Sequence, residues 1–462
     1  MSIVNTREYL GFCINAEAHI FKVYSEPGHT TPYQLIVSDK NALSPIEQAA
    51  LEKDTVPTVY HWNDVIIKNN DDLIHLYARG KDFIPLSPLD FFDHLKKVKK
   101  NSAIGPLTMQ IQPNQVCNDA CIFCCTETYR ANPLYKKKRF SYDEWQEILT
   151  FFASNGGRVV EIIGGGEPTL LPYFEKVLAL IGDLGLKAYL FTNGYKFSLK
   201  DGTLNKPFLE LIAAHCILLN VSLDGYQHRD QVHRLRSSQK TEETFAGLEY
   251  IHTIRDPQQM GFYHSYIITG APGQYCNLED LESCIERLSH LGDAIHIQND
   301  FVNFSHQYID PQQGHEMIQP IIDSYFGKIY LYFNYPLIQR FHLKLPYENS
   351  IHNVPSSSFK KCMRSRVSPT FECGSNKLWP CGLYAGTAKL TDQHAFSSMP
   401  TQFQALYQSS DYKHNITCDS CINSSLNHTL GQFNEIIANN DNASCYLFYP
   451  KHYVENTMKV VV

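Results

Sequence analysis

The central part of the chain alternates two patterns of apolar and polar residues. Short runs rich in β-branched and aromatic residues are typical of strands, and between them apolar residues recur at helical spacing. Alternating strands and helices favour a parallel sheet with right-handed crossovers, so residues 105–305 are predicted to form an α/β unit, a partial (β/α)6 barrel. The predicted strands are Leu107–Ile111, Val159–Ile163, Ala188–Phe191, Ile217–Leu223, Phe262–Ile268 and Ala294–Gln298.

Helix signals lie between these strands. Ser141 and Glu144 have the spacing of a capping box, which predicts a helix through Phe152. Pro172 suits the first turn of a helix through Ile181. Sites in parallel α/β folds form at the carboxyl ends of strands, and the motifs below follow predicted strands. The other helical patterns are Thr241–Ile251 and Leu278–Leu291.

The residues before the barrel, 1–104, are predicted to form an α+β extension. They contain a possible hairpin of Thr58–Ile67 with Leu73–Arg79, with its turn at Asn69-Asn70-Asp71. Two interpretations stay open for this extension. It is either a small domain that packs on the barrel or a module that binds the recognition segment of a substrate.

The residues after the barrel are divided into two further units. Residues 306–355 are predicted as a connector with one helix and the strand Lys328–Phe333. Residues 356–462 are rich in cysteine and are predicted to form a separate C-terminal domain.

Composition and charge narrow the class of protein. Hydrophobic residues make up 43% of the 462 residues and the formal net charge is -7, so we expect a folded protein that does not bind nucleic acid. The basic run Lys136–Arg139 is more typical of a solvated loop than of a binding patch. The stretch Met1–Leu10 does not have the pattern of a secretory signal, and no apolar run approaches about eighteen residues. These features predict a cytoplasmic protein without a membrane span.

The chain has 14 cysteines, and they cluster. In a protein without a secretory signal, clustered cysteines indicate metal or redox chemistry rather than a disulfide framework. The first cluster is Cys117-Asn-Asp-Ala-Cys121-Ile-Phe-Cys124, directly after a predicted strand. Three thiolates can hold three irons of a four-iron cubane and leave one iron open to a substrate. A zinc site is the alternative, although zinc sites usually show paired Cys-x-x-Cys elements.

This cysteine motif, with Phe123 before its last cysteine, resembles that of the radical SAM superfamily. The segment Gly164-Gly165-Gly166-Glu167-Pro168 follows the second predicted strand and is similar to the Gly-Gly-Glu-Pro element of that family. The resemblance implies that this element contacts the amino group of the methionine part of S-adenosylmethionine (SAM). Glycines let a backbone approach a ligand closely, and Glu167 could receive the ammonium group.

Two further strand ends resemble the family more weakly. They are Phe191-Thr192-Asn193-Gly194 and Val221-Ser222-Leu223-Asp224-Gly225. The resemblance implies that Asn193, Ser222 and Asp224 line the cavity for SAM and substrate. Turn formation is the simpler alternative, because Asn-Gly and Asp-Gly pairs favour turns.

The resemblance also implies a reaction. A 4Fe–4S cluster passes one electron to SAM, which splits into methionine and a 5′-deoxyadenosyl radical that removes hydrogen from a substrate carbon. An electron donor such as flavodoxin or ferredoxin would then be a partner.

The second group of cysteines is Cys362, Cys381, Cys418 and Cys421. Four thiolates can complete a cluster with no open iron, and the spacing is similar to that of the Twitch half of a SPASM/Twitch domain. Leu378-Trp379-Pro380-Cys381 resembles the end of the hairpin that separates the first two ligands there. We therefore expect an auxiliary 4Fe–4S cluster, with a structural zinc site as the alternative.

Two other cysteines are candidate hydrogen-atom donors. Cys373 lies between two predicted auxiliary ligands and Cys276 follows the fifth predicted strand. Peptide epimerases of the radical SAM class quench a Cα radical from a cysteine thiol, and the resemblance gives Cys373 that role, with Cys276 as its rival. Otherwise Cys373 is a small buried residue of the core.

The favoured hypothesis is a radical SAM enzyme that epimerises a ribosomally made precursor peptide. Formation of thioether or carbon–carbon crosslinks in a peptide is the nearest alternative, and a small-molecule dehydrogenase of the Twitch type is another. An iron–sulfur sensor is disfavoured, because a sensor has no need of a segment that binds SAM.

Overall fold

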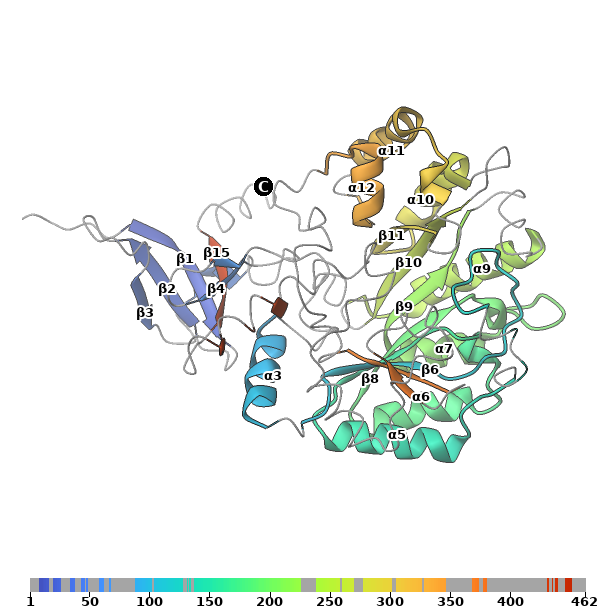
Figure 1. Cartoon of the computed structure of the whole chain (residues 1–462), viewed down its shortest axis with the longest axis horizontal. Coiled ribbons are helices and arrows are strands. Elements are labelled where there is room, and N and C mark those ends of the chain that lie inside the picture. The colour runs from blue at the N-terminus through green and yellow to red at the C-terminus, as the bar shows by residue number, and fades with distance from the viewer. Residues whose placement is uncertain are drawn as a thin grey trace, which may run out of the picture.

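The structure is a computed structural model, and its strands form two separate β-sheets (Figure 1). Its described residues are 8–15, 20–25, 34–37, 43–45, 47–48, 58–61, 66–67, 88–101, 104–127, 131, 133, 137–225, 238–257, 260–269, 277–300, 305–325, 328–345, 368–373, 377–379, 430–431, 434, 437–438 and 445–450.

The larger sheet has the strand order β12-β11-β10-β9-β8-β7-β6-β13-β14. Its strands from β6 to β12 are parallel, and each neighbour in space is the neighbour in sequence. All six predicted strands are present with small shifts of their ends, which confirms an α/β fold with a mostly parallel sheet. The strands are β6 Thr108–Gln112, β7 Val159–Ile162, β8 Lys187–Thr192, β9 Cys216–Ser222, β10 Gly261–Ile268, β11 Ala294–Asn299 and β12 Tyr330–Phe333.

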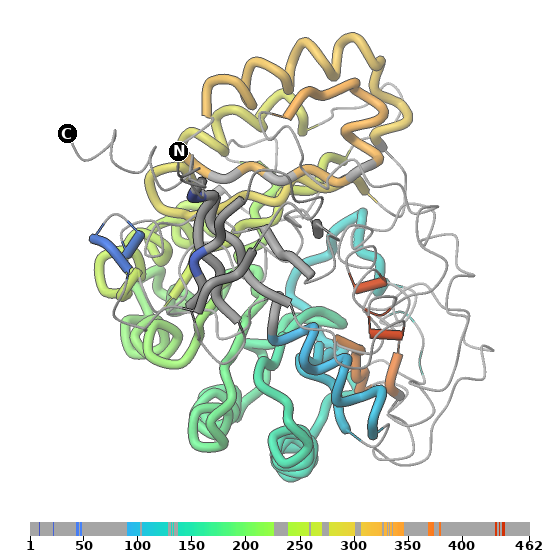
Figure 2. The backbone as a smooth tube through the Cα atoms, turned by 90° about the vertical axis from the view of Figure 1, so that its left-hand side faces the viewer, coloured from blue at the N-terminus to red at the C-terminus, as the bar shows by residue number. Residues whose placement is uncertain are grey.

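Helices connect the strands and cover the outer side of the sheet (Figure 2). The predicted capping box is confirmed: Ser141 and Glu144 exchange hydrogen bonds at the start of the first helix. Pro172 lies just before the N-cap Tyr173, so its predicted place in the first helical turn is wrong by two residues. The helices are α5 Tyr142–Ser154, α6 Phe174–Asp183, α7 Lys206–His215, α9 Ser238–Ile254, α10 Leu281–Ser289, α11 Pro311–Tyr325 and α12 Tyr335–Phe341, with short 3-10 helices η1 Pro168–Leu170, η2 Tyr195–Phe197, η4 Asn277–Asp280 and η5 Ser305–Gln307.

The part of the chain after residue 305 adds to this sheet. The strand predicted at Lys328–Phe333 is present as β12, which pairs with β11 in parallel. Two helices, α11 and α12, flank β12, where one helix was predicted. The stretch predicted as a connector thus supplies a seventh parallel strand and its crossover helix.

The two faces of the larger sheet differ in chemistry. Outward side chains such as Ile111, Leu190 and Leu219 join the helices in one continuous apolar core. Because successive side chains of a strand point to opposite faces, the residues between them face inward. The strand registers align these inward residues in rows that are largely polar or aromatic. One row holds Phe191, Asn220 and Tyr263, and the next holds Ser222, Ser265 and His296.

A hairpin extends the sheet beyond β6. Strand β13 (Thr370–Glu372) pairs in parallel with β6 and antiparallel with β14 (Lys377–Trp379). Inward polar side chains hold it there: the Thr370 hydroxyl donates to Gln110 Oε1 at 2.7 Å, and Gln110 Nε2 donates to Glu161 Oε2 at 2.7 Å. The hairpin expected at Leu378-Trp379-Pro380-Cys381 is therefore present as far as Trp379, and it belongs to the barrel sheet.

The smaller sheet combines the two ends of the sequence. Its order is β3-β2-β1-β15-β4-β5, so a strand from the predicted C-terminal domain lies between two strands of the N-terminal extension (Figure 1). This pairing was not predicted, because residues 1–104 and 356–462 were assigned to separate domains. The strands are β1 Glu8–Asn15, β2 Ile20–Ser25, β3 Gln34–Val37, β4 Thr58–His61, β5 Ile66–Ile67 and β15 Cys445–Pro450.

The hairpin in the N-terminal extension forms between other segments than those predicted. Strand β4 pairs with β5, so both strands lie within the segment predicted as the first arm. The predicted second arm, Leu73–Arg79, lies outside the described residues. Asn63 and Asp64, between β4 and β5, are turn-forming residues that compete with the Asn69-Asn70-Asp71 signal.

Helix α3 (Pro88–Lys100) precedes the first barrel strand and contacts two other parts of the chain. Its Asp90 pairs with Arg158 at 3.0 Å, just before β7, and its Lys99 donates to the carbonyl of Ile437 at 2.8 Å. In the described part of the chain, no helix is long and apolar enough to cross a membrane.

Candidate functional site

The cysteine loop, residues 113–126, follows β6 and lies against the glycine loop, residues 163–167, that follows β7. Backbone hydrogen bonds join them: Gly166 N donates to Asn114 O at 2.6 Å and Glu167 N donates to Val116 O at 2.8 Å. The Asn114 side chain fixes the junction, since its Nδ2 donates to Glu167 O and its Oδ1 accepts from Val116 N, both at 2.8 Å. The two motifs predicted from sequence therefore form one unit.

This close approach explains two of the glycines. A Cβ on Gly166 would lie 1.9 Å from the carbonyl oxygen of Val116, and one on Gly165 would lie 2.5 Å from that of Asn114. Gly165 also has a positive φ of 74°, which favours glycine. These glycines are required by the backbone of the cysteine loop, whereas the sequence interpretation related them to a ligand. Gly164, with φ 54°, has only Gln112 Nε2 at 4.0 Å from such a Cβ, and so faces more open space.

The three predicted cluster ligands, Cys117, Cys121 and Cys124, lie half-buried in this loop. The backbone N–H of Cys124 donates to the carbonyl of Cys121 at 3.2 Å, which forms a turn between them. Cys124 Sγ lies 3.2 Å from the hydroxyl of Thr126, and that hydroxyl donates to the carbonyl of Gly165 at 2.7 Å. Thr126 thus links a predicted ligand to the glycine loop, a role that the sequence motif did not reveal.

The three cysteines of the loop are a donor set that fits an iron–sulfur cluster. The described residues contain no group of three or more His, Cys, Asp or Glu side chains that could hold one metal ion. In a cubane each cysteine binds a different iron, so the thiolates need not converge on one point. Soft thiolate ligands without carboxylates are also the set that iron–sulfur clusters prefer.

Glu167 is buried, with 3% of its surface exposed, and its carboxylate is already hydrogen-bonded. Its Oε1 accepts from the backbone and hydroxyl of Thr169 at 3.1 and 2.6 Å and from the Thr192 hydroxyl at 2.7 Å. Its Oε2 accepts from Asn193 N at 2.7 Å. Burial raises the pKa of Glu167, although these hydrogen bonds act in the opposite direction.

These bonds give Glu167 a structural role that was not predicted. It caps η1, which begins at Pro168, and it binds the carboxyl end of β8 through Thr192 and Asn193. Of its two oxygens, Oε2 accepts one hydrogen bond and keeps capacity for a ligand. A second buried acceptor, Gln115 Oε1 in the cysteine loop, has no hydrogen-bond partner in the described part of the chain. Both oxygens suit a bound group that carries N–H donors.

Asn193 connects the end of β8 to the cysteine loop. Its side-chain Nδ2 donates to Oδ1 of Asn118 at 2.8 Å, and Asn118 is the residue after Cys117. Its own Oδ1 accepts from Tyr195 N at 3.1 Å, which is the turn expected of an Asn-Gly pair. One side chain of Asn193 therefore makes both the turn contact and a contact with the cysteine loop.

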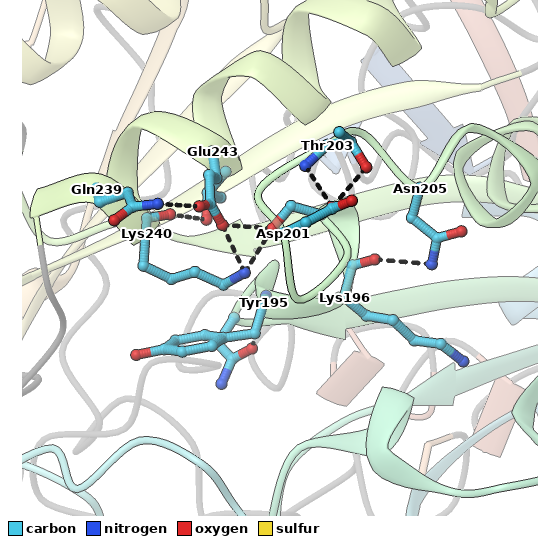
Figure 3. Close-up of polar contacts among 11 residues, drawn as sticks. Tyr195, Lys196, Asp201, Thr203, Asn205, Gln239, Lys240 and Glu243 are labelled. Carbon is cyan, nitrogen blue, oxygen red and sulfur yellow. Dashed lines mark hydrogen bonds and ion pairs between the residues drawn. The ribbon is translucent and has the colours of Figure 1, made fainter.

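The segment after Asn193 is fixed by the start of α9 (Figure 3). The Lys240 ammonium binds Glu243 at 2.8 Å and lies 5.2 Å from the centre of the Tyr195 ring. Ser198 bridges the two segments, because it donates to Glu243 and accepts from Lys240. These contacts hold the loop after β8 against the rest of the barrel.

Ser222 and Asp224 end β9 on the same edge of the sheet. Ser222 is half-buried on the inner face and aligns with Ser265 of β10. Asp224 is buried, and its Oδ1 accepts from Ile267 N at 2.8 Å while its carbonyl accepts from Asn277 Nδ2 at 2.9 Å. The first bond ties the end of β9 to β10 and the second ties it to η4, so the described contacts of Asp224 are structural.

Cys373 follows β13 and lies beside the end of β6. Its backbone N–H donates to Gln112 O at 3.1 Å, and its thiol donates to Lys138 O at 3.6 Å. The side chain is 7% exposed and belongs to the apolar core. Burial, reinforced by the neighbouring Glu372 carboxylate, raises the pKa of the Cys373 thiol well above its usual range, so the sulfur carries its hydrogen at neutral pH.

Other predicted site residues lie outside the described part of the chain. They are Cys276, Cys362, Cys381, Cys418 and Cys421.

Residues 111–288 match the family model described as the Radical SAM superfamily. The matched segment runs from β6 into α10 and contains the cysteine loop, the glycine loop and the ends of β8 and β9. The chain therefore contains a radical SAM domain, which implies a 4Fe–4S cluster and SAM as cofactors and SAM-dependent radical chemistry.

Solved structures also resemble the chain at low identity. A structure of anSMEcpe with bound AdoMet is 16% identical, with a TM-score of 0.44 over 70% of this chain and 85% of that one. TYW1 with a lysine-pyruvate adduct is 15% identical, with a TM-score of 0.32 over 47% of this chain and 73% of that one. BtrN in complex with AdoMet and 2-DOIA is 10% identical, with a TM-score of 0.30 over 73% of this chain and 92% of that one. We draw nothing further from likenesses this distant.

Proposed function

We propose that this chain, through its radical SAM domain, is an enzyme that cleaves SAM reductively and uses the product radical on a peptide. The observation that carries the proposal is the direct bonding of three loops at one edge of the barrel. The cysteine loop binds the glycine loop through Asn114, and it binds the end of β8 through Asn118 and Asn193. Cluster ligands and SAM-binding residues predicted from separate motifs are thereby held together.

Different residues of these loops would bind the cluster and SAM. Cys117, Cys121 and Cys124 would hold three irons of a 4Fe–4S cluster, and the open iron would bind SAM. Glu167 Oε2 and Gln115 Oε1 would accept hydrogen bonds from the SAM ammonium. When bound, the cluster and SAM supply a 5′-deoxyadenosyl radical that removes a hydrogen atom from the substrate. The inner face of the barrel would have to exclude water from that radical.

A peptide is the proposed substrate because the inner face of the barrel offers hydrogen-bonding side chains in successive rows. Asn220 and Ser265 lie in two of these rows. The separate six-stranded sheet supports the same proposal as a second module that could bind another part of a long substrate. Crosslinking within a peptide and oxidation of a small alcohol remain the alternatives.

Epimerisation is the proposed reaction, with Cys373 as its candidate hydrogen donor, although the described contacts of this thiol lie in the apolar core on the outer side of the sheet. Quenching a carbon radical requires an S–H group rather than a thiolate, and burial keeps this thiol protonated. The residue also follows a strand that is parallel to β6, so it lies at the same edge of the sheet as the cysteine loop. Cys276 is the rival donor.

An auxiliary 4Fe–4S cluster on Cys362, Cys381, Cys418 and Cys421 is part of the proposal. Its support is the β13–β14 hairpin, which lies between the first two of these cysteines in sequence. A flavodoxin or ferredoxin is the proposed electron donor, because the cluster must receive one electron in each reductive cleavage.

The test is anaerobic incubation of the reconstituted protein with SAM, dithionite and a candidate precursor peptide in deuterated water. Formation of 5′-deoxyadenosine supports SAM cleavage, and its absence contradicts the proposal. A gain of one mass unit in the peptide indicates epimerisation, whereas a loss of two units indicates a crosslink or an oxidation.

A further inference from the structure

Asn220, in the middle of β9, is fully buried on the inner face of the barrel, yet one of its polar atoms is not paired. Its Nδ2 donates to the hydroxyl of Ser265 at 3.0 Å. Its Oδ1 has no hydrogen-bond partner among the residues that the structure describes. A buried amide oxygen without a hydrogen bond is costly, and native proteins rarely keep one without a reason.

Ser265, on the adjacent strand β10, offers the complementary atom. Its oxygen accepts from Asn220 Nδ2 and, at 3.4 Å, from Gln298 Nε2 of β11. Because both of these bonds end on the oxygen, the hydroxyl hydrogen remains to be donated elsewhere. An unused acceptor and an available donor therefore lie on neighbouring strands.

These side chains lead inward from the edge that carries the cysteine loop. Gln298, nearest the carboxyl end, is half-exposed, Ser265 is 8% exposed and Asn220 is fully buried. Phe191 and Tyr263 are the neighbours of Asn220 in its row, so Asn220 is flanked by aromatic side chains. A group that enters from the carboxyl edge would meet Gln298 first and Asn220 last.

We propose that Asn220 and Ser265 bind one secondary amide of the substrate, with Asn220 Oδ1 accepting its N–H and the Ser265 hydroxyl donating to its carbonyl. An ammonium group would satisfy only the acceptor and a carboxylate only the donor, and either charge would be buried without a counter-ion in this pair. An amide satisfies both and is neutral. This inference rests on the proposed function, and it specifies a backbone amide as the recognised group.

The proposal is tested by binding of two probes to the full-length protein with its clusters reconstituted. N-methylacetamide carries the N–H of a single secondary amide, and methyl acetate has an ester oxygen at the same position. Saturation-transfer NMR titrations should give a dissociation constant about tenfold lower for the amide than for the ester, as expected for one buried hydrogen bond. Equal affinities in the wild-type protein would overturn the proposal.

Two variants separate the two hydrogen bonds. Asn220→Leu, similar in size, should lower the amide-to-ester preference to about one, because the acceptor of the N–H is gone. Ser265→Ala should weaken both probes while the preference remains, because both probes keep a carbonyl. Preservation of the preference in Asn220→Leu contradicts the proposal. If Asn220→Leu does not fold, unchanged affinity of both probes in Ser265→Ala contradicts it equally.

Asn155→Leu is the matched control. Asn155 ends α5 at the opposite edge of the barrel, where its Nδ2 donates to Phe151 O at 2.8 Å. This variant should keep the wild-type probe affinities. SAM cleavage by the wild-type protein is measured separately: without 5′-deoxyadenosine the proposed function fails, whereas the NMR result still decides the amide site.

Discussion

Asn193 Nδ2 donates a hydrogen bond to Oδ1 of Asn118 at 2.8 Å, which ties the end of β8 to the cysteine loop. Asn118 is exposed and lies next to a predicted cluster ligand, whereas Asn193 is buried and is bound to Glu167 through its backbone. One side-chain contact thus connects the proposed cluster ligands to the buried carboxylate.

Loss of this contact should loosen the cluster without removing a ligand. In Asn118→Ala we expect chelator-driven loss of iron from the first cluster to be about fivefold faster, which corresponds to about 1 kcal/mol for one hydrogen bond. The decay of the cluster absorbance measures it. Asn118→Asp keeps the acceptor oxygen and should decay like the wild-type protein. Equal decay of the alanine variant and the wild type would mean that the contact does not support the loop.

Simultaneous replacement of Cys117, Cys121 and Cys124 by alanine should abolish formation of 5′-deoxyadenosine from SAM. Iron bound elsewhere in the chain should remain, and iron analysis checks this. Cys125→Ala is the matched control, because this half-buried cysteine lies in the same loop but is not a predicted ligand. If the triple variant still cleaves SAM, the assignment of the cluster is wrong.

Glu167→Ala should weaken both SAM binding and the fold. It removes the acceptor of the buried Asn193 N–H and of Thr192, and an unsatisfied buried donor costs about 1–3 kcal/mol. We expect a lower melting temperature together with a SAM affinity lowered by about tenfold or more.

The pH dependence separates the two roles of Glu167. Burial raises the pKa of this carboxyl, and only its ionised form pairs with an ammonium, so SAM affinity should fall as the pH is lowered toward that pKa. Glu167→Gln should bind SAM weakly with no such dependence. A wild-type affinity that is independent of pH in acid would indicate that SAM does not contact this carboxyl.

Cys373→Ala should still cleave SAM but fail to place a solvent-derived hydrogen on the peptide. Mass spectrometry of the peptide after reaction in deuterated water measures the transfer. Cys216→Ala is the matched control, because Cys216 is another buried thiol whose pKa burial raises, to about 12. Full activity of Cys373→Ala would move the donor to Cys276, and full activity of both variants would rule out epimerisation by either thiol.

His264 should make the fold sensitive to acid. It is fully buried beside Gly292, and burial lowers its pKa from 6.5 to about 4, with a smaller opposing effect of Asp293 and a reinforcing one of Arg255. Between these pH values the unfolded chain binds a proton that the folded chain does not. Stability is therefore complete above pH 6.5 and falls as the pH drops through this window, by at most about 1.4 kcal/mol per pH unit.

Melting temperatures measured from pH 7 to pH 5 check this. Burial also lowers the pKa of His94 and of His306, so these two histidines add to the slope of stability against pH. His264→Leu should therefore flatten the pH dependence of the melting temperature but not remove it. An unchanged slope in His264→Leu would show that this histidine does not titrate on unfolding.

The barrel strands were predictable because their information is local. Runs such as Val159–Ile162 carry their own pattern, and the Ser141 capping box needs only four residues. Helix α7 was not predicted, although Pro207 in its first turn is a helix-start signal. Of the described site, the cysteine and glycine loops were identified from motifs.

The contacts between elements were not predictable in this way. Nothing near Glu167 in sequence indicates that Thr192 and Asn193 bind it, and nothing near Asn220 indicates an unpaired oxygen. Pairing of β13 with β6 depends on polar side chains, Thr370 and Gln110, that look like surface residues in a strand pattern. Such contacts join residues far apart in the chain, so no sequence window contains both partners.

The position of β15 between β1 and β4 imposes an order on biosynthesis. Both of those strands leave the ribosome before the barrel does, and their shared partner follows only after it, at roughly 5–20 residues per second. Until then each has an unpaired edge, which is a template for association with other chains. The nascent chain therefore carries an incomplete sheet with exposed strand edges while the barrel is being synthesised. Chaperones that cover strand edges should matter most during that interval.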